Sequence, residues 1–196
     1  WHLLSSAILR GSDGMVTETG MRDTVRHVLL PLWNSWYFLT LYANAAGHQG
    51  VHRTDSPNVL DQYVMAKTRD LVDATTASLD AYDLFGACQH VRDHLDVLTN
   101  WYIRRSRSRF WEGDHDAIDT MHTVLAVLVR ITAPLLPFIS EAIHHGMNDG
   151  MNDGMNDGAN HLGGDDTTLG VDPDREFMPA GQAVGGIGEL VPAGER

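Results

Sequence analysis

Apolar residues recur at steps of three and four through residues 1–146, and no stretch alternates apolar and polar residues long enough to demand a strand. Steps of three and four place side chains on one face of an α-helix, so the pattern predicts helices throughout this part. We expect helices over residues 17–46, 60–79, 82–111, 116–132 and 138–145. Antiparallel helices joined in this order pack as an all-α, up-and-down helix bundle.

The first expected helix contains its own start and stop signals. Thr17 or Thr19 can cap its first turn, and Gly47 is a typical residue just after a helix end. Pro31 removes one backbone donor and should kink the helix, unless two helices meet at that point. Residues 47–58 contain two glycines and a Ser-Pro-Asn turn signal, which predicts a loop.

The third expected helix is the longest, at about 45 Å for residues 82–111. Its apolar stripe is spaced 4, 3, 4, 3 and 4, which is typical of the narrow seam between antiparallel helices. The stripe comprises Leu84, Cys88, Val91, Leu95, Leu98 and Tyr102. The helix over residues 116–132 has a wider apolar face, so we expect it to be the most buried.

Acidic charge and glycine are concentrated at the end of the chain. Residues 1–146 carry 12 basic and 16 acidic side chains, whereas residues 147–196 carry 2 and 10, with 11 of the 19 glycines. Such a segment has too little apolar surface to offset the entropy of ordering it. The composition predicts a helical domain over residues 1–146 and a disordered, low-complexity tail over residues 147–196.

The tail opens on a tandem repeat in which Gly-Met-Asn-Asp begins at Gly146 and recurs from Gly150 and Gly154. A solvated linker is the simpler interpretation of such a segment. Calcium binding is the alternative, but a calcium loop needs carboxylates at alternate positions and a bidentate glutamate. Here the spacing is four and no glutamate follows closely, so we favour the linker.

The rest of the composition limits the class of protein. The single cysteine, Cys88, excludes an intrachain disulfide and a zinc site of four cysteines. No apolar run approaches the roughly 18–20 residues that span a bilayer, and the first residues lack the basic leader of a signal peptide. We expect a cytoplasmic monomer without a membrane partner. Because the chain starts on Trp1, we expect a processed protein or a piece of a larger one.

The densest chemical signal is the run NWYIRRSRSRFW over residues 100–111, in which four arginines are flanked by four aromatic residues. In an acidic protein, a local concentration of positive charge allows contact with a polyanion. Arginine forks onto phosphate, and aromatic faces can stack on unpaired bases. The run therefore predicts contact with nucleic acid.

Helix geometry divides the four arginines between two faces. Arg105 and Arg109 continue the face of Tyr102, so we expect these three residues to be structural or interdomain anchors, with the arginines on carboxylates of neighbouring segments. Arg104 and Arg107 point roughly the opposite way, with Trp111 between them, so the predicted contacts with nucleic acid are Arg104, Arg107, Trp111 and Trp101. The alternative is that all four arginines are solvated or paired with acidic residues such as Asp93 and Asp96.

Other candidate sites are weaker. His90 and His94 have the i, i+4 spacing of a metal clamp, but the glutamate of a zincin and further ligands are not evident. Ser5 and Ser6 lie near His2 without a carboxylate partner, which does not make a triad. There is no glycine-rich phosphate loop of either standard kind. We therefore assign no catalytic residue, no metal ligand and no ATP site to this segment.

At this point the sequence resembles the isoleucyl-tRNA synthetases, which are class I enzymes. The arginine-aromatic run is similar to a signature of that family, and other segments fit in the same order. These segments are WHLLSSAILRGSD (residues 1–13), LLPLWNSWYFLTLYAN (29–44), LDAYDLFGAC (79–88) and APLLPFISEAI (133–143). The resemblance covers about residues 1–145 and implies a helical anticodon-binding domain that holds the tRNA for isoleucine.

The resemblance also implies what this chain lacks. The HIGH and KMSKS motifs and the editing domain of the family are absent, so we expect the segment alone to be inactive in attaching isoleucine. The resemblance implies that ATP and Mg are used by the catalytic domain of the same enzyme, which would be a partner of this domain. No cofactor is expected here. After Ile143 the family usually carries an aromatic residue, whereas this chain has two histidines and the repeats.

Two hypotheses from other classes remain. The chain could be a helical protein-interaction or scaffold domain without an RNA role, which the net charge of −12 supports because it would repel RNA at long range. It could also be a metal-dependent helical enzyme built on His90 and His94. Binding of tRNA for isoleucine in preference to other tRNAs would distinguish the anticodon-binding domain from both the scaffold domain and the metal-dependent enzyme.

Overall fold

The computed structural model describes residues 1–148, and within them every regular element is helical. In chain order the elements are η1 (Ala7–Arg10), α1 (Glu18–Thr24), η2 (Val25–Leu29), α2 (Leu30–Ala46), α3 (Val59–Asp80), α4 (Leu84–Asp96), η3 (Val97–Ile103), α5 (Arg104–Trp111), α6 (His115–Thr132) and α7 (Pro137–Asn148). η1 is a 3₁₀ turn, whereas η2 and η3 are π-helical. The all-α prediction is confirmed.

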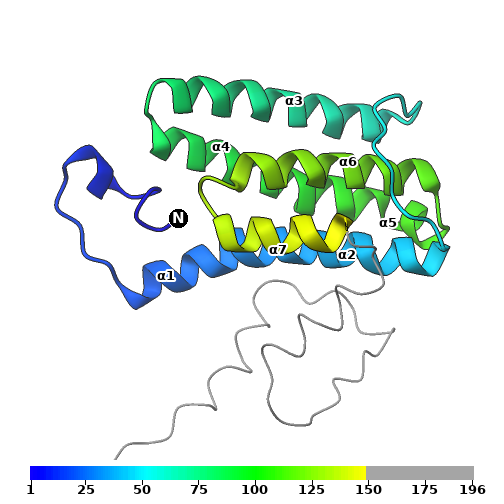
Figure 1. The fold of residues 1–196 in the computed structure, drawn as a ribbon, viewed down its shortest axis with the longest axis horizontal. Helices are drawn as coiled ribbons and strands as arrows, with labels where there is room; N and C mark the ends of the chain where they lie inside the picture. Colours follow the sequence, from blue (N-terminus) through cyan, green and yellow to red (C-terminus); the bar gives the residue numbers. More distant parts are fainter. Residues whose placement is uncertain (149–196) are drawn as a thin grey trace, which may run out of the picture. The chain divides into compact units, whose positions relative to one another are not determined.

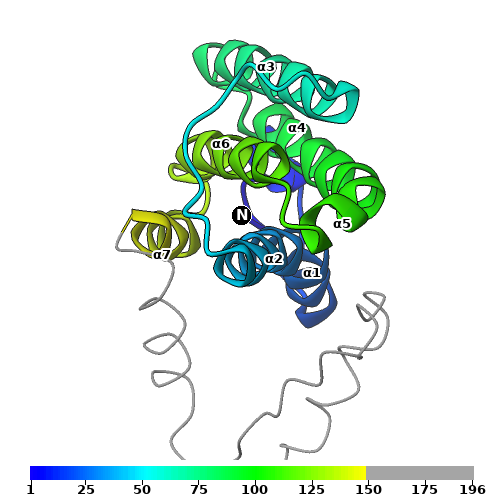
Figure 2. The ribbon, with the colours of Figure 1, turned by 90° about the vertical axis from the view of Figure 1, so that its right-hand side faces the viewer.

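The helices run up and down, and α6 lies in the middle of the bundle (Figure 1). Seen along the bundle, the pair α3 and α4 lies on one side of α6, and α2 and α7 lie on the other (Figure 2). α6 packs against α2, α3, α5 and α7. Its apolar residues Ile118, Met121 and Leu125 are fully buried, as the wide apolar face predicts. Within the described residues, no helix is both long and apolar enough to cross a membrane.

The first long helix continues through Pro31. Thr17 caps it by accepting a hydrogen bond from the Gly20 N–H at 3.1 Å, as predicted. The π turn η2 precedes Pro31, and the Leu30 N–H bonds to the Val25 carbonyl, five residues back. The helix therefore accommodates Pro31, which has no backbone N–H, by means of a wide turn between α1 and α2. Gly47 ends α2 with φ 61°, a left-handed conformation that glycine adopts without strain.

The start of α6 and the end of α7 are each held by contacts that the structure shows. Asp114 caps α6 by accepting hydrogen bonds from the Asp116 and Ala117 N–H groups. α7 runs to Asn148, so the helical part extends past the expected boundary at residue 146, and Met147 is only 6% exposed. Gly146 lies so close to Trp36 that an added Cβ would clash with the indole ring. A bulkier residue there would separate α7 from α2.

The predictions for the tail concern residues that the structure does not describe. The disorder, the calcium alternative and most of the Gly-Met-Asn-Asp repeat fall on residues 149–196. The domain division therefore stays a prediction, apart from the extension of α7.

Candidate nucleic-acid interface

The arginine-aromatic run lies at one end of the bundle. α5 ends there, α6 begins there, and the loop of residues 47–58 crosses from α2 to α3 at the same end (Figure 1). The inner and outer sides of α5 have different chemistry. Ser106 and Phe110 face the core and are at most 1% exposed, and Phe110 packs edge-on against Phe38.

A buried carboxylate holds the inner side of this end together. Asp61, on the first turn of α3, is fully buried and accepts two hydrogen bonds from the Arg109 guanidinium, at 2.6 and 2.8 Å. The Tyr102 hydroxyl donates to the same carboxylate at 2.9 Å, and the Ser56 hydroxyl donates at 2.6 Å. A bidentate arginine with further donors supplies the hydrogen bonds that a buried carboxylate requires. The structure thus places Arg109 and Tyr102 as anchors between α5, η3 and α3.

Arg109 also reaches the start of α6. Its Nε donates to Asp114 at 2.8 Å, and Asp114 is the cap of α6. The hydrogen bonds to Asp61 raise the pKa of Arg109 above its ordinary value. Burial raises the pKa of Asp114, but hydrogen bonds and charge from Arg109 outweigh burial, so the pKa lies below its ordinary value. Burial raises the pKa of the Tyr102 phenol, and Asp61 raises it further. All three groups keep their usual charge near neutral pH.

The outer side of α5 carries the residues predicted to bind nucleic acid. Arg104 and Arg107 are exposed, and Trp111 is 77% exposed. Arg104 and Arg107 are therefore not buried against carboxylates of their own chain. An exposed tryptophan next to exposed guanidinium groups is a combination that can meet both bases and phosphates. RNA contact by these three residues stays a prediction.

Arg105 does not lie on the core face as its helical phase predicted, and its role as an anchor to an adjoining domain stays a prediction. Arg105 is exposed and lies over the ring of Trp101, with its Cζ 5.4 Å from the ring centroid, instead of meeting a carboxylate. The Trp101 ring in turn packs against Tyr63 of α3, with centroids 4.3 Å apart. The physical reason is the π turn η3, which has more residues per turn than an α-helix and so shifts the core face from Arg105 to Ser106.

The sequence analysis missed how the loop of residues 47–58 is fixed. Asp119 of α6 hydrogen-bonds the His48 ring at 2.7 Å and accepts from the Val51 N–H at 3.0 Å. The Thr123 hydroxyl accepts from the Arg53 N–H at 2.8 Å. Four buried polar residues on an apolar helix, including Asp119 and Thr123, were the available signal, because buried polar groups need partners.

The histidine pair of the metal hypothesis does not converge. His94 is 4% exposed, whereas His90 is partly exposed. Burial lowers the pKa of the His94 imidazole to about 4. Across residues 1–148, no three histidine, cysteine, aspartate or glutamate side chains gather closely enough to hold a metal ion.

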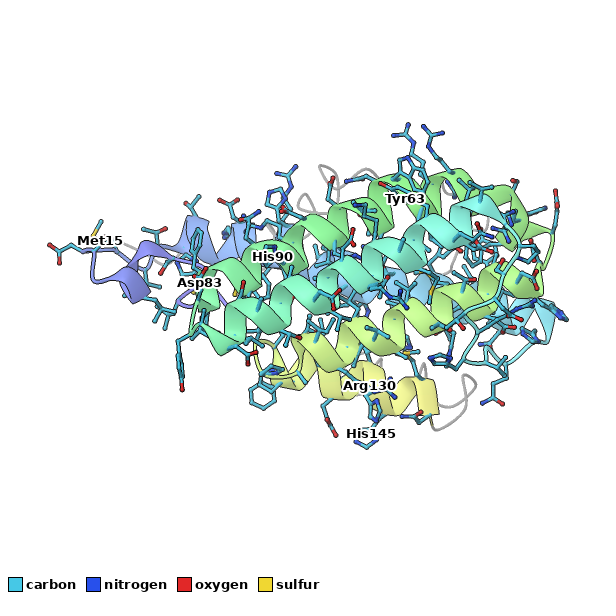
Figure 3. The ribbon with its side chains drawn as sticks, turned by 90° about the horizontal axis from the view of Figure 1, so that it is seen from above. Met15, Tyr63, Asp83, His90, Arg130 and His145 are labelled. Carbon is cyan, nitrogen blue, oxygen red and sulfur yellow. The ribbon has the colours of Figure 1, made fainter. Side chains whose placement is uncertain are left out.

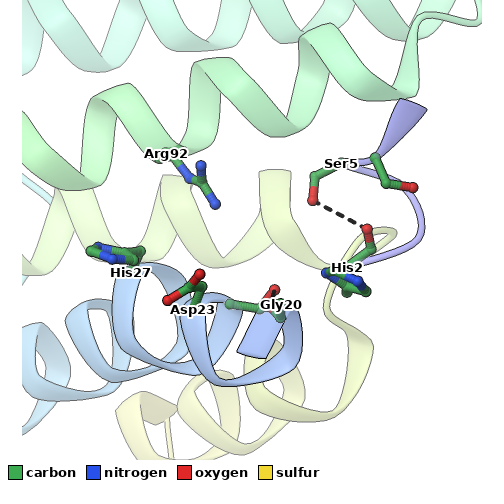
Figure 4. A pocket seen from close by; sticks show the side chains of 8 residues that line it. His2, Ser5, Gly20, Asp23, His27 and Arg92 are labelled. Carbon is green, nitrogen blue, oxygen red and sulfur yellow. Dashed lines mark hydrogen bonds between the residues drawn. The ribbon is translucent and has the colours of Figure 1, made fainter. Parts of the chain in front are cut away.

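A pocket of about 430 Å³ lies at the other end of the bundle, where the N-terminal segment meets α1 and α4. Figure 4 shows His2, Asp23, His27 and Arg92 around it, and Ser5 hydrogen-bonded to the His2 carbonyl. No pattern in the sequence predicted this pocket, because its lining comes from three separate segments. It contains no member of the arginine-aromatic run.

Comparison with known proteins identifies the family of this domain. A family model described as the anticodon-binding domain of tRNA ligase matches residues 61–169. The isoleucine–tRNA ligase of Nocardia farcinica is 55% identical over 147 residues, which cover 75% of this chain and 14% of that protein. Those of Leifsonia xyli and Mycobacterium tuberculosis are also 55% identical, over 149 and 147 residues. They cover 73% and 75% of this chain, and 13% and 14% of those proteins.

This chain therefore spans about a seventh of the length of the relatives that it matches. The matched part runs from the first turn of α3 through α7, and so includes Asp61 with its partners Arg109 and Tyr102, and the exposed side of α5. Because the family model covers more than half of the 196 residues, the chain belongs to the family of anticodon-binding domains of tRNA ligases, and it is similar to those of isoleucine–tRNA ligases.

Proposed function

We propose that this chain is the tRNA-binding part of an isoleucine–tRNA ligase and that it positions the tRNA for isoleucine during ATP-dependent attachment of the amino acid. The observation that carries the proposal is the division of α5. Arg109 fixes the inner side to Asp61 and Asp114, while Arg104 and Arg107 stand exposed on the outer side. A rigidly held helix can present cations to phosphate with little further loss of conformational entropy.

Phosphate contacts position an RNA, and contacts to bases add specificity. Arg104 and Arg107 supply the phosphate contacts in this proposal. Trp111 supplies an exposed aromatic surface for a base of the anticodon stem or loop. Trp101, which is covered by Arg105 and Tyr63, acts through Arg105 and does not offer an open ring face.

The rest of the reaction belongs to the remainder of such a ligase. We propose that ATP and Mg²⁺ are bound there. The catalytic domain of the same enzyme is then the protein partner of this domain. We further propose that the chain is monomeric, acts in the cytoplasm and does not attach isoleucine by itself.

The alternative is a protein-interaction or scaffold domain. The net charge of −12 is the single feature that favours it, and much of that charge lies in residues 147–196. The exposed arginines and Trp111 are equally available to a protein partner. The identity of 55% to ligases named for isoleucine favours the tRNA reading.

The test is the salt dependence of RNA binding. Each arginine that neutralises a phosphate adds about 0.7 to the slope of log affinity against log salt on single strands. The double variant Arg104→Ala, Arg107→Ala should lower this slope by about 1.4, measured by fluorescence anisotropy with labelled tRNA for isoleucine. The matched control, Arg92→Ala with Arg130→Ala, removes the same charge from exposed positions outside α5.

An unchanged slope in the α5 variant, or an equal fall in the control, would contradict the assignment. A competition experiment checks the choice of RNA, since tRNA for isoleucine should displace the label at lower concentration than tRNAs for other amino acids. Binding of a protein partner without any RNA binding would support the scaffold alternative.

A further inference from the structure

Four exposed or half-exposed side chains form a row from α5 to α3. Arg105 lies over Trp101 at 5.4 Å, Trp101 packs on Tyr63 at 4.3 Å, and the Lys67 Nζ lies 5.9 Å from the centre of the Tyr63 ring. We call these four residues the cation–aromatic row. It has a cation at each end and two rings between them, and its residues come from segments almost 40 positions apart.

The row is open to solvent along its length. Tyr63 is 39% exposed, the Lys67 side chain is 42% exposed, and Arg105 is exposed, while Trp101 is half-buried beneath its neighbours. Tyr63 lies on the outer edge of the bundle, on the side away from Arg130 (Figure 3). Tyr63 and Lys67 lie outside the buried core, whereas Trp101 is partly buried and packs against it.

The rings hold the two cations in place. A guanidinium or ammonium group within about 6 Å of a ring centroid is attracted to the ring face. Long cationic side chains otherwise lose rotamer freedom when they bind a ligand, and a cation that a ring already orients loses less. Because Arg105 and Lys67 lie against ring faces, the row is better suited to phosphates than to stacking of bases between its rings.

We propose that the cation–aromatic row is a second RNA-backbone contact, through which α3 as well as α5 holds the RNA. The inference rests on the proposed function and adds Lys67, Tyr63 and Arg105 to the interface. RNA is the partner that fits, because the row adjoins α5 and continues its positive charge within a domain that is otherwise net acidic.

The proposed RNA-backbone contact on α3 ends at Lys67. Lys67 pairs with Asp70 at 3.0 Å, one helical turn further along α3. An exposed pair of this kind is weak and screened by salt, so a phosphate can take the place of Asp70. A backbone that passed beyond Lys67 would meet the Asp70 carboxylate instead. The row therefore marks the edge of the footprint on α3.

The experiment measures affinity of the full 196-residue chain for labelled tRNA for isoleucine at several salt concentrations. Lys67→Ala should lower the slope of log affinity against log salt by about 0.7, the value for one phosphate on a single strand. Tyr63→Ala should also lower the slope, because Lys67 loses the ring that orients it. Tyr63→Phe keeps the ring and should bind as the unaltered chain does, and Arg130→Ala removes one exposed charge from the opposite edge as the matched control.

Three outcomes would overturn the inference. If Lys67→Ala and Tyr63→Ala leave the slope unchanged while the Arg104 and Arg107 double variant lowers it, the row has no RNA role and the proposed function stands. If Arg130→Ala lowers the slope as much as Lys67→Ala, the effect is one of net charge. If the unaltered chain binds no tRNA, both the inference and the proposed function fail. A thermal melt of each variant checks that the fold is retained.

Discussion

The four arginines of α5 meet different environments within six positions. Arg109 is held by two carboxylates, Arg105 lies on an aromatic ring, and Arg104 and Arg107 are exposed. Helical phase alone predicted where Arg109, Arg104 and Arg107 lie. It failed at Arg105 because the residues before α5 form a π turn, whose occurrence depends on packing that no local pattern of side chains reveals.

The same scale gives a prediction for the pH dependence of stability. Burial lowers the pKa of His94 to about 4, from an ordinary value of about 6.5. Between these values the unfolded chain binds a proton that the folded chain does not, so protonation favours unfolding. The contribution of His94 is complete above pH 6.5 and is lost as the pH falls toward 4, by about 3 kcal/mol in full.

Urea unfolding at several pH values measures this effect. The variant His94→Leu should show a smaller fall in the free energy of unfolding between pH 6.5 and 4 than the unaltered chain. His122, whose pKa is lowered by burial, contributes in the same direction and is present in both proteins. Equal pH dependence of the two proteins would show that His94 does not stay neutral in the fold.

At the scale of elements, the sequence predicted the helices better than the connections. The cap at Thr17, one of two expected candidates, and the stop at Gly47 are local signals, and each occurs where it was expected. The loop of residues 47–58 is different, because its backbone is fixed by Asp119 and Thr123, about 70 positions away. Polar residues on a buried helix face indicate that partners exist but not which segment supplies them.

The loop should therefore respond to a change in α6. Asp119→Ala removes the acceptor of the Val51 N–H and the partner of the His48 ring, so the amide of Val51 should exchange its hydrogen faster. The loss of stability should be about 1–3 kcal/mol, the usual result of leaving buried polar groups unpaired. Native-state hydrogen exchange measures both.

Asp119→Asn is the matched control for this change. It keeps an oxygen acceptor at the same place, so Val51 should remain more protected than in the alanine variant. Equal exchange in the two variants would mean that the loop does not depend on the hydrogen bond to Asp119.

At the scale of the whole molecule, the bundle and its core followed from periodicity, but the central network did not. The sequence pattern around Asp61 indicates only a polar residue at the start of a helix. Its partner Arg109 lies 48 positions later. A single sequence does not pair distant charges. The anchoring of Arg109 to some carboxylate followed from its face, whereas the choice of Asp61 required the structure.

This network gives a prediction for global stability. Asp61→Ala leaves Arg109 without its bidentate partner and Tyr102 and Ser56 without an acceptor, and should lower the free energy of unfolding by about 3–5 kcal/mol. The double variant Asp61→Leu, Arg109→Met replaces both charges by apolar groups and should recover part of that loss. Denaturant unfolding measures both variants.

The double variant also separates stability from binding. Because Arg104 and Arg107 are untouched, it should bind tRNA with the salt slope of the unaltered chain wherever it remains folded. No recovery in the double variant would mean that Asp61 acts through Tyr102 and Ser56 rather than through the ion pair.

The π turn η3 determines how far α5, which carries the four arginines, is rotated about the helix axis relative to α4. One α-helical residue corresponds to a rotation of about 100°. Deletion of one residue within residues 97–103 would rotate α5 about the helix axis, while α4 kept its packing partners. A different guanidinium would then look outward. The same rotation would take Arg109 away from Asp61 and Phe110 away from Phe38, so a one-residue deletion there would change the outward charge and the anchoring of the helix together.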